Sequence, residues 1–236
     1  MSSTSTKTRN GVTKIITQVP QANEFLQKNV LRGNTFRLVI ALVSGGLFAW
    51  LASFIHNKAL LLLDIYLTHK LQKRKNPLLI GFAKAISYVN THVLLNIVAV
   101  PIALVLWIKR LRLESGMMIG LLVTSTFTRL SVQRLINRPR PNPLFVRIKR
   151  GARGKSFPSG HVIASTTFWG WLLTIYQAHG GRNKAFLIIP RAFIVLSGPS
   201  RVYLGKHWTS DVTGGYLISG ALLSLFSWVY HLVRQQ

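Results

Sequence analysis

Four long stretches without charged residues constrain this chain more than any other feature of its sequence. They cover residues 38–55, 86–108, 162–178 and 212–230, and the only histidine inside them is His92. Apolar runs of about 18 residues or more are typical of helices that cross a lipid bilayer. The sequence therefore predicts an all-α, polytopic membrane protein that has the bilayer itself as a partner.

The net charge at first suggests a different partner. The chain carries 30 Lys and Arg against 4 Asp and Glu, for a net charge of +26 at pH 7. A nucleic-acid-binding protein, however, concentrates its basic residues on a soluble surface or a tail. Here the basic residues alternate with the uncharged apolar runs, so we expect no nucleic acid partner.

The apolar runs and their boundaries predict a six-transmembrane-helix bundle. The expected spans are residues 36–55, 91–108, 116–136, 161–178, 185–200 and 212–231. Pro190 is expected to interrupt the fifth span. The chain then divides into a basic N-terminal tail, residues 1–34, and a membrane domain, residues 35–236.

The segment between the first two spans has a different pattern. Leu60, Leu63, Leu67 and Leu71 recur at helical spacing among polar and charged residues. This pattern is typical of amphipathic helices that lie on the membrane surface. We therefore expect one or two interfacial helices here.

Six spans bring three polar segments, 57–90, 137–160 and 201–211, to one side of the membrane, opposite both termini. Basic residues occur on both sides in similar numbers, so the positive-inside rule does not decide the orientation. We expect cytoplasmic termini and an active site on the extracytoplasmic face of the plasma (inner) membrane. The sequence indicates no oligomeric state.

The polar groups of that shared side are of the chemical types that bind phosphate in proteins. Arginine presents a planar fork suited to phosphate oxygens, and a helix start offers free backbone N–H groups. Gly160 adds an amide that no side chain covers. The other candidates are Arg138, Arg140, Lys155, Ser159, His161, Arg201, Lys206, His207 and Asp211.

Two histidines are suited to different catalytic roles. His207 and Asp211 are four residues apart, within reach across one turn, so the carboxylate can orient the ring and leave its other nitrogen as a nucleophile. His161 is then suited to act as general acid and later as general base. The carboxylates are too few for a Mg²⁺ site, and we expect no metal and no cofactor.

These residues together resemble the phosphatidic acid phosphatase type 2 superfamily of membrane lipid phosphatases. The family pattern is Lys-x6-Arg-Pro, then Pro-Ser-Gly-His, then Ser-Arg-x5-His-x3-Asp. The second motif is complete at 158–161, and the third is complete from Ser200 to Asp211. In the first motif Arg140 and Pro141 match, but Gln133 stands at the lysine position.

The resemblance implies a role for each matched residue. His207 would form a phosphohistidine, Asp211 would be its partner and His161 the acid and base. Ser159, Gly160, Arg140 and Arg201 would hold the phosphate. Gln133 can donate a hydrogen bond but brings no charge, and we expect Arg138 or Lys155 to supply the missing cation.

The expected substrate is a lipid phosphate or diphosphate whose tail stays in the bilayer. Phosphatidic acid, phosphatidylglycerol phosphate and a polyprenyl diphosphate of the undecaprenyl type all fit this description. Two alternatives stay open. The chain could bind lipid phosphates without catalysis, as a scaffold, or it could transfer the phosphoryl group to an acceptor other than water.

Overall fold

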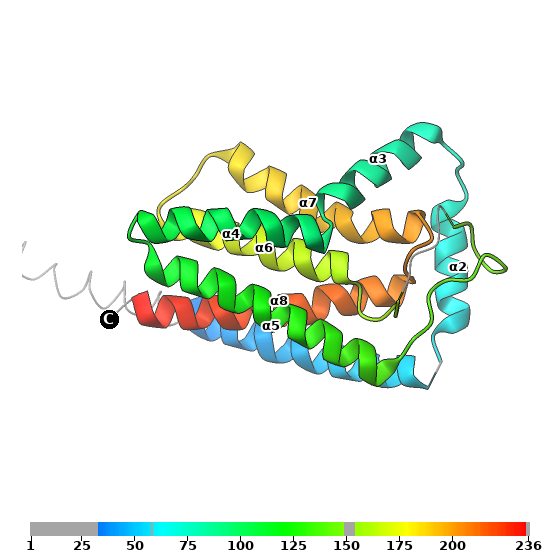
Figure 1. The fold of residues 1–236 in the computed structure, drawn as a ribbon. Helices are drawn as coiled ribbons and strands as arrows, with labels where there is room; N and C mark the ends of the chain where they lie inside the picture. Colours follow the sequence, from blue (N-terminus) through cyan, green and yellow to red (C-terminus); the bar gives the residue numbers. More distant parts are fainter. Residues whose placement is uncertain (1–32, 58, 149–153, 235–236) are drawn as a thin grey trace, which may run out of the picture.

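The computed structural model describes residues 33–57, 59–148 and 154–234, and this part of the chain contains helices but no strands (Figure 1). Most of the predicted N-terminal tail, residues 1–32, lies outside the described residues. The helices are the first helix, Gly33–His56, followed by α2 (Leu61–Gln72), α3 (Pro77–Val89), α4 (His92–Ile108), α5 (Arg112–Ile136), α6 (Gly160–Ala178), α7 (Lys184–Tyr203) and α8 (Thr209–Arg234).

Each of the six predicted spans corresponds to a helix, with ends that agree within four residues. The expected interruption at Pro190 is wrong, because α7 continues through both Pro190 and Pro199. Helix α7 begins at Asn183, whose side chain accepts a hydrogen bond from the backbone N–H of Ala185. Such a cap satisfies one of the free N–H groups at the helix start.

Three described helices are long and apolar enough to cross a membrane: Gly33–His56, α7 and α8. Helices α3 and α4 meet at a bend of 44° and would count as a fourth span if taken together. These helices support a membrane protein, whereas the count of six spans stays a prediction. Helix α5 has a more polar sequence, with Arg129 and Arg134 in its second half.

Helix α2 lies across one end of the bundle (Figure 1). Its buried residues are the polar Asp64, Thr68 and Gln72, while Leu62 and Leu63 are exposed. The helix therefore turns a polar stripe toward the protein and leucines away from it. The interfacial location expected for this helix stays a prediction.

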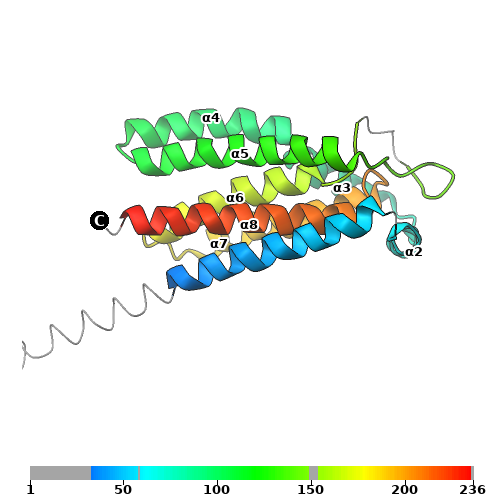
Figure 2. The ribbon, with the colours of Figure 1, turned by 90° about the horizontal axis from the view of Figure 1, so that it is seen from below.

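The central helix is α6, which packs against α4, α5, α7 and α8 (Figure 2). Its buried Phe168 and Trp171 share a core with Leu95, Met118 and Tyr230. Large apolar side chains also cover much of the outer surface of the bundle. An apolar exterior is unfavourable in water but suits the hydrocarbon of a bilayer.

Candidate active site

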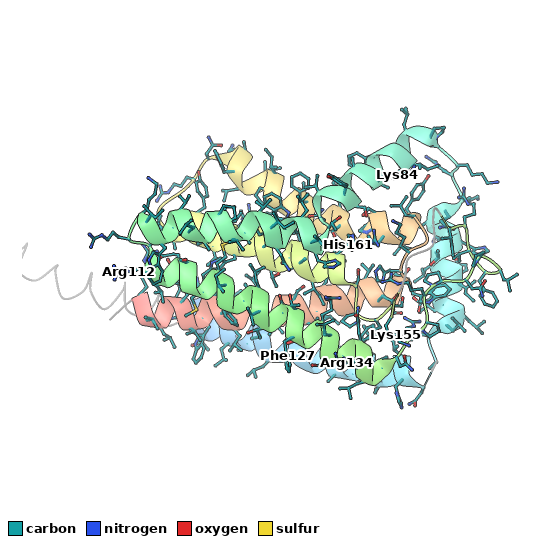
Figure 3. The ribbon with its side chains drawn as sticks, in the orientation of Figure 1. Lys84, Arg112, Phe127, Arg134, Lys155 and His161 are labelled. Carbon is teal, nitrogen blue, oxygen red and sulfur yellow. The ribbon has the colours of Figure 1, made fainter. Side chains whose placement is uncertain are left out.

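The three polar segments that topology predicted on one side do meet at one end of the bundle. The backbone N–H of Ser159 donates to the carbonyl of Asp211 at 3.1 Å, and that of Ser210 donates to Asp64 Oδ1 at 2.8 Å. Figure 3 shows His161 and Lys155 toward this end, near α2, whereas Arg112 lies at the other end. The candidate residues are therefore neighbours in space, although up to 78 residues separate them in sequence.

The turn between α7 and α8 positions His207. Gly205 has a φ of 68°, and a Cβ atom at this position would lie 2.0 Å from the carbonyl oxygen of Arg147. Only glycine combines that backbone conformation with so close an approach. The turn places the His207 side chain in the interior, where it is 1% exposed.

Asp211 is fully buried in the first turn of α8 and is surrounded by donors. Its Oδ2 accepts hydrogen bonds from the Ser156 hydroxyl and from the backbone N–H of Trp208, the latter at 2.8 Å. Its Oδ1 accepts from Arg138 Nη1 at 2.7 Å. The bond to Trp208 also caps α8, so this carboxylate both begins the helix and serves the site.

The imidazole of His207 lies between this carboxylate and an arginine. Its Nδ1 is 3.4 Å from Asp211 Oδ2, and its Nε2 is 3.0 Å from Arg140 Nη1. Because the guanidinium can only donate, Nε2 must accept, and the ring proton then belongs on Nδ1, facing Asp211. Nε2 therefore keeps the lone pair that a nucleophile needs.

Burial lowers the pKa of His207 to about 4, although Asp211 acts in the opposite direction and the charge of Arg140 adds to the lowering. A buried imidazole loses the hydration that would stabilise its protonated form. At neutral pH the ring is therefore neutral. This is the protonation state required for nucleophilic attack.

Arg140 reaches the site from the loop after α5. Its Nη1 donates to the carbonyl of Lys206 at 2.7 Å as well as to His207, and its Nε donates to the carbonyl of Gly154 at 3.2 Å. Burial lowers the pKa of the guanidinium. The arginine is thus held beside the lone pair of His207, where an attacked phosphate would carry its oxygens.

Arg138 does not have the partners expected of a phosphate ligand. Its side chain is 8% exposed and forms buried ion pairs with Asp64 at 2.6 Å and with Asp211 at 2.7 Å. Two carboxylates therefore use this guanidinium, and the role of Arg138 as a substitute for the missing lysine stays a prediction. Asp64, from α2, is thereby paired with a basic residue of the loop after α5.

Arg201 extends from the last turn of α7 and is 4% exposed. Its Nη1 donates to the hydroxyl of Ser87 in α3, while its Nε has no partner among the described residues. A buried donor without a partner is costly, and an anion in the site would satisfy it.

The start of α6 brings Ser159, Gly160 and His161 to the same place. Ser159 is the N-cap residue, and its fully buried hydroxyl has no partner in the described part of the chain. Gly160 is the first residue of the helix, so its amide is one of the free N–H groups at a positive helix end.

The ring of His161 packs edge-on against the ring of His92, with 5.9 Å between centroids. Electrostatic contributions from Arg201, His207 and Lys206 also reach His161. His92 therefore belongs to the surroundings of His161. His92 lies beside His161 because the start of α4 meets the start of α6. No local sequence motif indicates this contact.

The two remaining candidates for phosphate binding are Gln133 and Lys155. Gln133 donates from Nε2 to the carbonyl of Pro158 at 3.3 Å, which ties α5 to the segment before α6. Lys155 is exposed on that segment. Among the described residues, neither side chain forms an ion pair.

With this geometry in place, comparison with known proteins identifies the class. A sequence model of the PAP2 superfamily matches residues 113–235, more than half of the chain. The chain therefore belongs to the PAP2 superfamily. The match covers α5 to α8, and thus most of the residues that surround His207.

Solved structures support the same assignment. The chain is 25% identical to a transmembrane PAP2-type phosphatidylglycerolphosphate phosphatase from Bacillus subtilis, with a TM-score of 0.68 over 79% of this chain and 93% of that one. It is also 25% identical to LpxE from Aquifex aeolicus, with a TM-score of 0.56 over 70% of this chain and 94% of that one.

A curated relative matches over a shorter region. An acid phosphatase from Zymomonas mobilis is 36% identical over 97 residues, which are 38% of this chain and 34% of the relative. The matched region thus spans about a third of that protein's length.

Proposed function

We propose that this protein is an integral membrane phosphatase that hydrolyses a lipid phosphate or a polyprenyl diphosphate through a phosphohistidine. One observation carries the proposal: a neutral, buried His207 directs its unprotonated Nε2 toward Arg140 while Asp211 lies on the other side of the ring. The family assignment supports a phosphatase, and the two similar membrane proteins support a lipid substrate.

In the first half of the proposed reaction, His207 Nε2 attacks the phosphorus atom. The bond between phosphorus and the lipid oxygen breaks, and His161 donates its proton to the leaving oxygen. With a diphosphate, the leaving group is the lipid monophosphate. Asp211 stabilises the ring as it becomes positively charged, and the arginines stabilise the charge on the transferring oxygens.

In the second half, the roles of His161 reverse. His161 removes a proton from water, the water oxygen attacks phosphorus, and the bond between phosphorus and Nε2 breaks. Inorganic phosphate leaves, and Nε2 regains its lone pair. The cycle consumes one water, uses no metal and returns both histidines to their starting states.

The site residues proposed for phosphate binding are Arg140, Arg201, Ser159 and Gly160. Two of them, Ser159 and Arg201, have buried polar atoms without partners in the described chain. A cleft of about 280 Å³ between the first helix and the loop after α5 is lined in part by Arg140 and Trp208. This cleft supports a route for a headgroup to the side of Arg140.

The experiment that tests the function is phosphate release from purified protein in detergent. Short-chain phosphatidic acid, phosphatidylglycerol phosphate and a polyprenyl diphosphate serve as the substrate panel. We expect release that is lost in His207→Ala. Tight binding without release would favour the scaffold, and a phosphorylated product in the presence of added alcohol would favour phosphoryl transfer.

A further inference from the structure

Arg129 is a half-buried cation in the middle of a helix that packs on α6. Among the described residues, no ion pair involves Arg129. Ionisable residues at such positions are expensive and usually serve a function. None of the motifs discussed above includes it.

The Arg129 side chain crosses directly over the start of α6. A Cβ atom at Gly160 would lie 2.9 Å from Arg129 Cδ, 3.4 Å from its Nε and 3.6 Å from its Nη1. The guanidinium therefore lies against the residue whose amide begins α6. A side chain at position 160 would push it away, so the glycine leaves room for this arginine.

Arg129 also lies one helical turn before Gln133, on the same face of α5. Its Nη1 donates to Gln133 Oε1 at 3.4 Å, which is a long hydrogen bond and leaves most of the guanidinium's five donors available. Gln133 itself is used to hold Pro158. The positive charge that the family lysine would bring at position 133 is therefore available close by, from the guanidinium of Arg129.

The charge of Arg129 acts on the rest of the site. Burial lowers the pKa of Arg140, and the charge of Arg129 lowers it further, although Asp211 acts against both. Arg129 also acts electrostatically on His92, which packs against His161. Arg129 and Arg140 repel each other across this region, and a shared anion would turn that repulsion into attraction.

We propose that Arg129 binds the oxygens of the substrate phosphate together with Arg140 and Arg201, and supplies the positive charge that Gln133 lacks. This inference rests on the proposed function, because the phosphate is the one that His207 attacks. It replaces the earlier expectation that Arg138 or Lys155 fills this role.

The first test is kinetic and compares Arg129→Gln with Arg129→Lys and Arg134→Gln. A charge-assisted hydrogen bond contributes about 1.5–3 kcal/mol, so R129Q should lower kcat/KM about 10- to 100-fold. R129K keeps the charge and should recover most of the loss. R134Q is the matched control, because Arg134 is exposed on the same helix (Figure 3), and it should match the wild type.

A second variant separates charge from local structure. In the R129Q background, Gln133→Lys places a cation one turn further along α5 and should restore part of kcat/KM. Thermal unfolding in detergent checks that each variant is folded. R129Q activity equal to that of the wild type, or a loss that neither lysine rescues, would overturn the inference.

The third readout does not require turnover. Inorganic phosphate should raise the melting temperature of the wild-type protein and of R134Q, and should raise that of R129Q much less. An equal shift in R129Q would overturn the inference even if no substrate is turned over. Absence of turnover in the wild type, with a phosphate shift that depends on Arg129, would contradict the proposed function alone.

Discussion

The two ends of the bundle each bury a carboxylate beside a histidine, but only one has the features of an active site. At the end near the C-terminus, Glu114 Oε1 accepts from the Tyr230 hydroxyl at 2.8 Å and lies 3.0 Å from His179 Nε2. At the other end, Asp211 accompanies His207. The difference lies in what surrounds each pair.

The partners of Glu114 satisfy one another. Arg234 donates to the Tyr230 hydroxyl at 3.0 Å and to the carbonyl of Ala178 at 2.7 Å. None of the described buried side-chain atoms that lack a partner belongs to this group. Such a closed network is suited to holding α5, α6 and α8 together.

The Asp211 end has a surplus of positive charge and unsatisfied atoms. Arg140 and Arg201 surround His207, while the acidic Asp64 and Asp211 are both occupied by Arg138. Buried atoms of Ser159, Arg201 and His92 have no partners in the described residues. A buried acid beside a histidine is therefore not enough to indicate a site, whereas a cluster of arginines and buried polar atoms without partners in the described residues is.

The largest effect should separate the two ends directly. His207→Gln removes the nucleophile and should lower kcat about 10³-fold or more. Glu114→Gln should leave kcat/KM close to that of the wild type and lower the melting temperature, because it weakens a closed network. Comparable loss of turnover in both variants would break the comparison.

Asp211→Asn should produce the next largest effect. An amide at this position no longer favours a proton on Nδ1, so His207 presents the wrong tautomer, and kcat should fall about 10²- to 10⁴-fold. The KM should change little, since Asp211 does not face the phosphate. A change confined to KM would contradict its role as the partner of His207.

Asp64→Asn tests the buried ion pair between Asp64 and Arg138, the arginine that also pairs with Asp211. Removing one partner of a buried ion pair costs about 3–5 kcal/mol of stability. We expect a marked drop in the melting temperature and a smaller loss of kcat than in Asp211→Asn. A wild-type melting temperature in this variant would show that the pair does not stabilise the fold.

The pH dependence of kcat/KM tests the environment of His207. Because burial lowers its pKa to about 4, the ring stays neutral, and the lone pair stays available, as the pH falls through 6 and 5. The acid limb that belongs to His207 should therefore appear near pH 4, not near the usual value of about 6.5. Nuclear magnetic resonance titration of the His207 ring would assign that limb.

The smallest effect should come from metal removal. The reaction proposed for His207 and His161 needs no metal, so phosphate release should be unchanged by excess EDTA. Recovery of an EDTA-treated sample only after addition of Mg²⁺ would contradict the proposed reaction, because a metal ion would then provide the charge assigned to the arginines.

Local patterns predicted the helices well. The six spans predicted from the apolar runs and their boundaries agree with the helix bounds within four residues, and the spacing of His207 and Asp211 predicted their contact across one turn. Both depend on residues close together in the sequence, although His207 lies in the turn just before α8 and Asp211 in the first turn of that helix. The topology of the runs also predicted that the polar segments would meet.

Contacts between distant segments were beyond local patterns. The pair of Arg138 and Asp64 joins residues 74 positions apart, and the packing of His92 on His161 depends on how α4 and α6 are placed. The inward polar stripe of α2 was missed for the same reason. The leucine spacing of α2 is visible in the sequence. The face that packs on the protein, however, is decided by the ion pair of Asp64 with Arg138 and by the hydrogen bonds of Gln72 with the backbone of Arg147.

Trapping of the covalent intermediate tests the central claim most directly. With p-nitrophenyl phosphate, whose leaving group needs no acid, His161→Ala should still form the phosphoenzyme and should hydrolyse it slowly. Rapid quenching and peptide mass spectrometry should then find an acid-labile phosphoryl group on His207. A phosphoryl group on Ser159, or turnover of the wild type with no covalent intermediate at His207, would contradict the account.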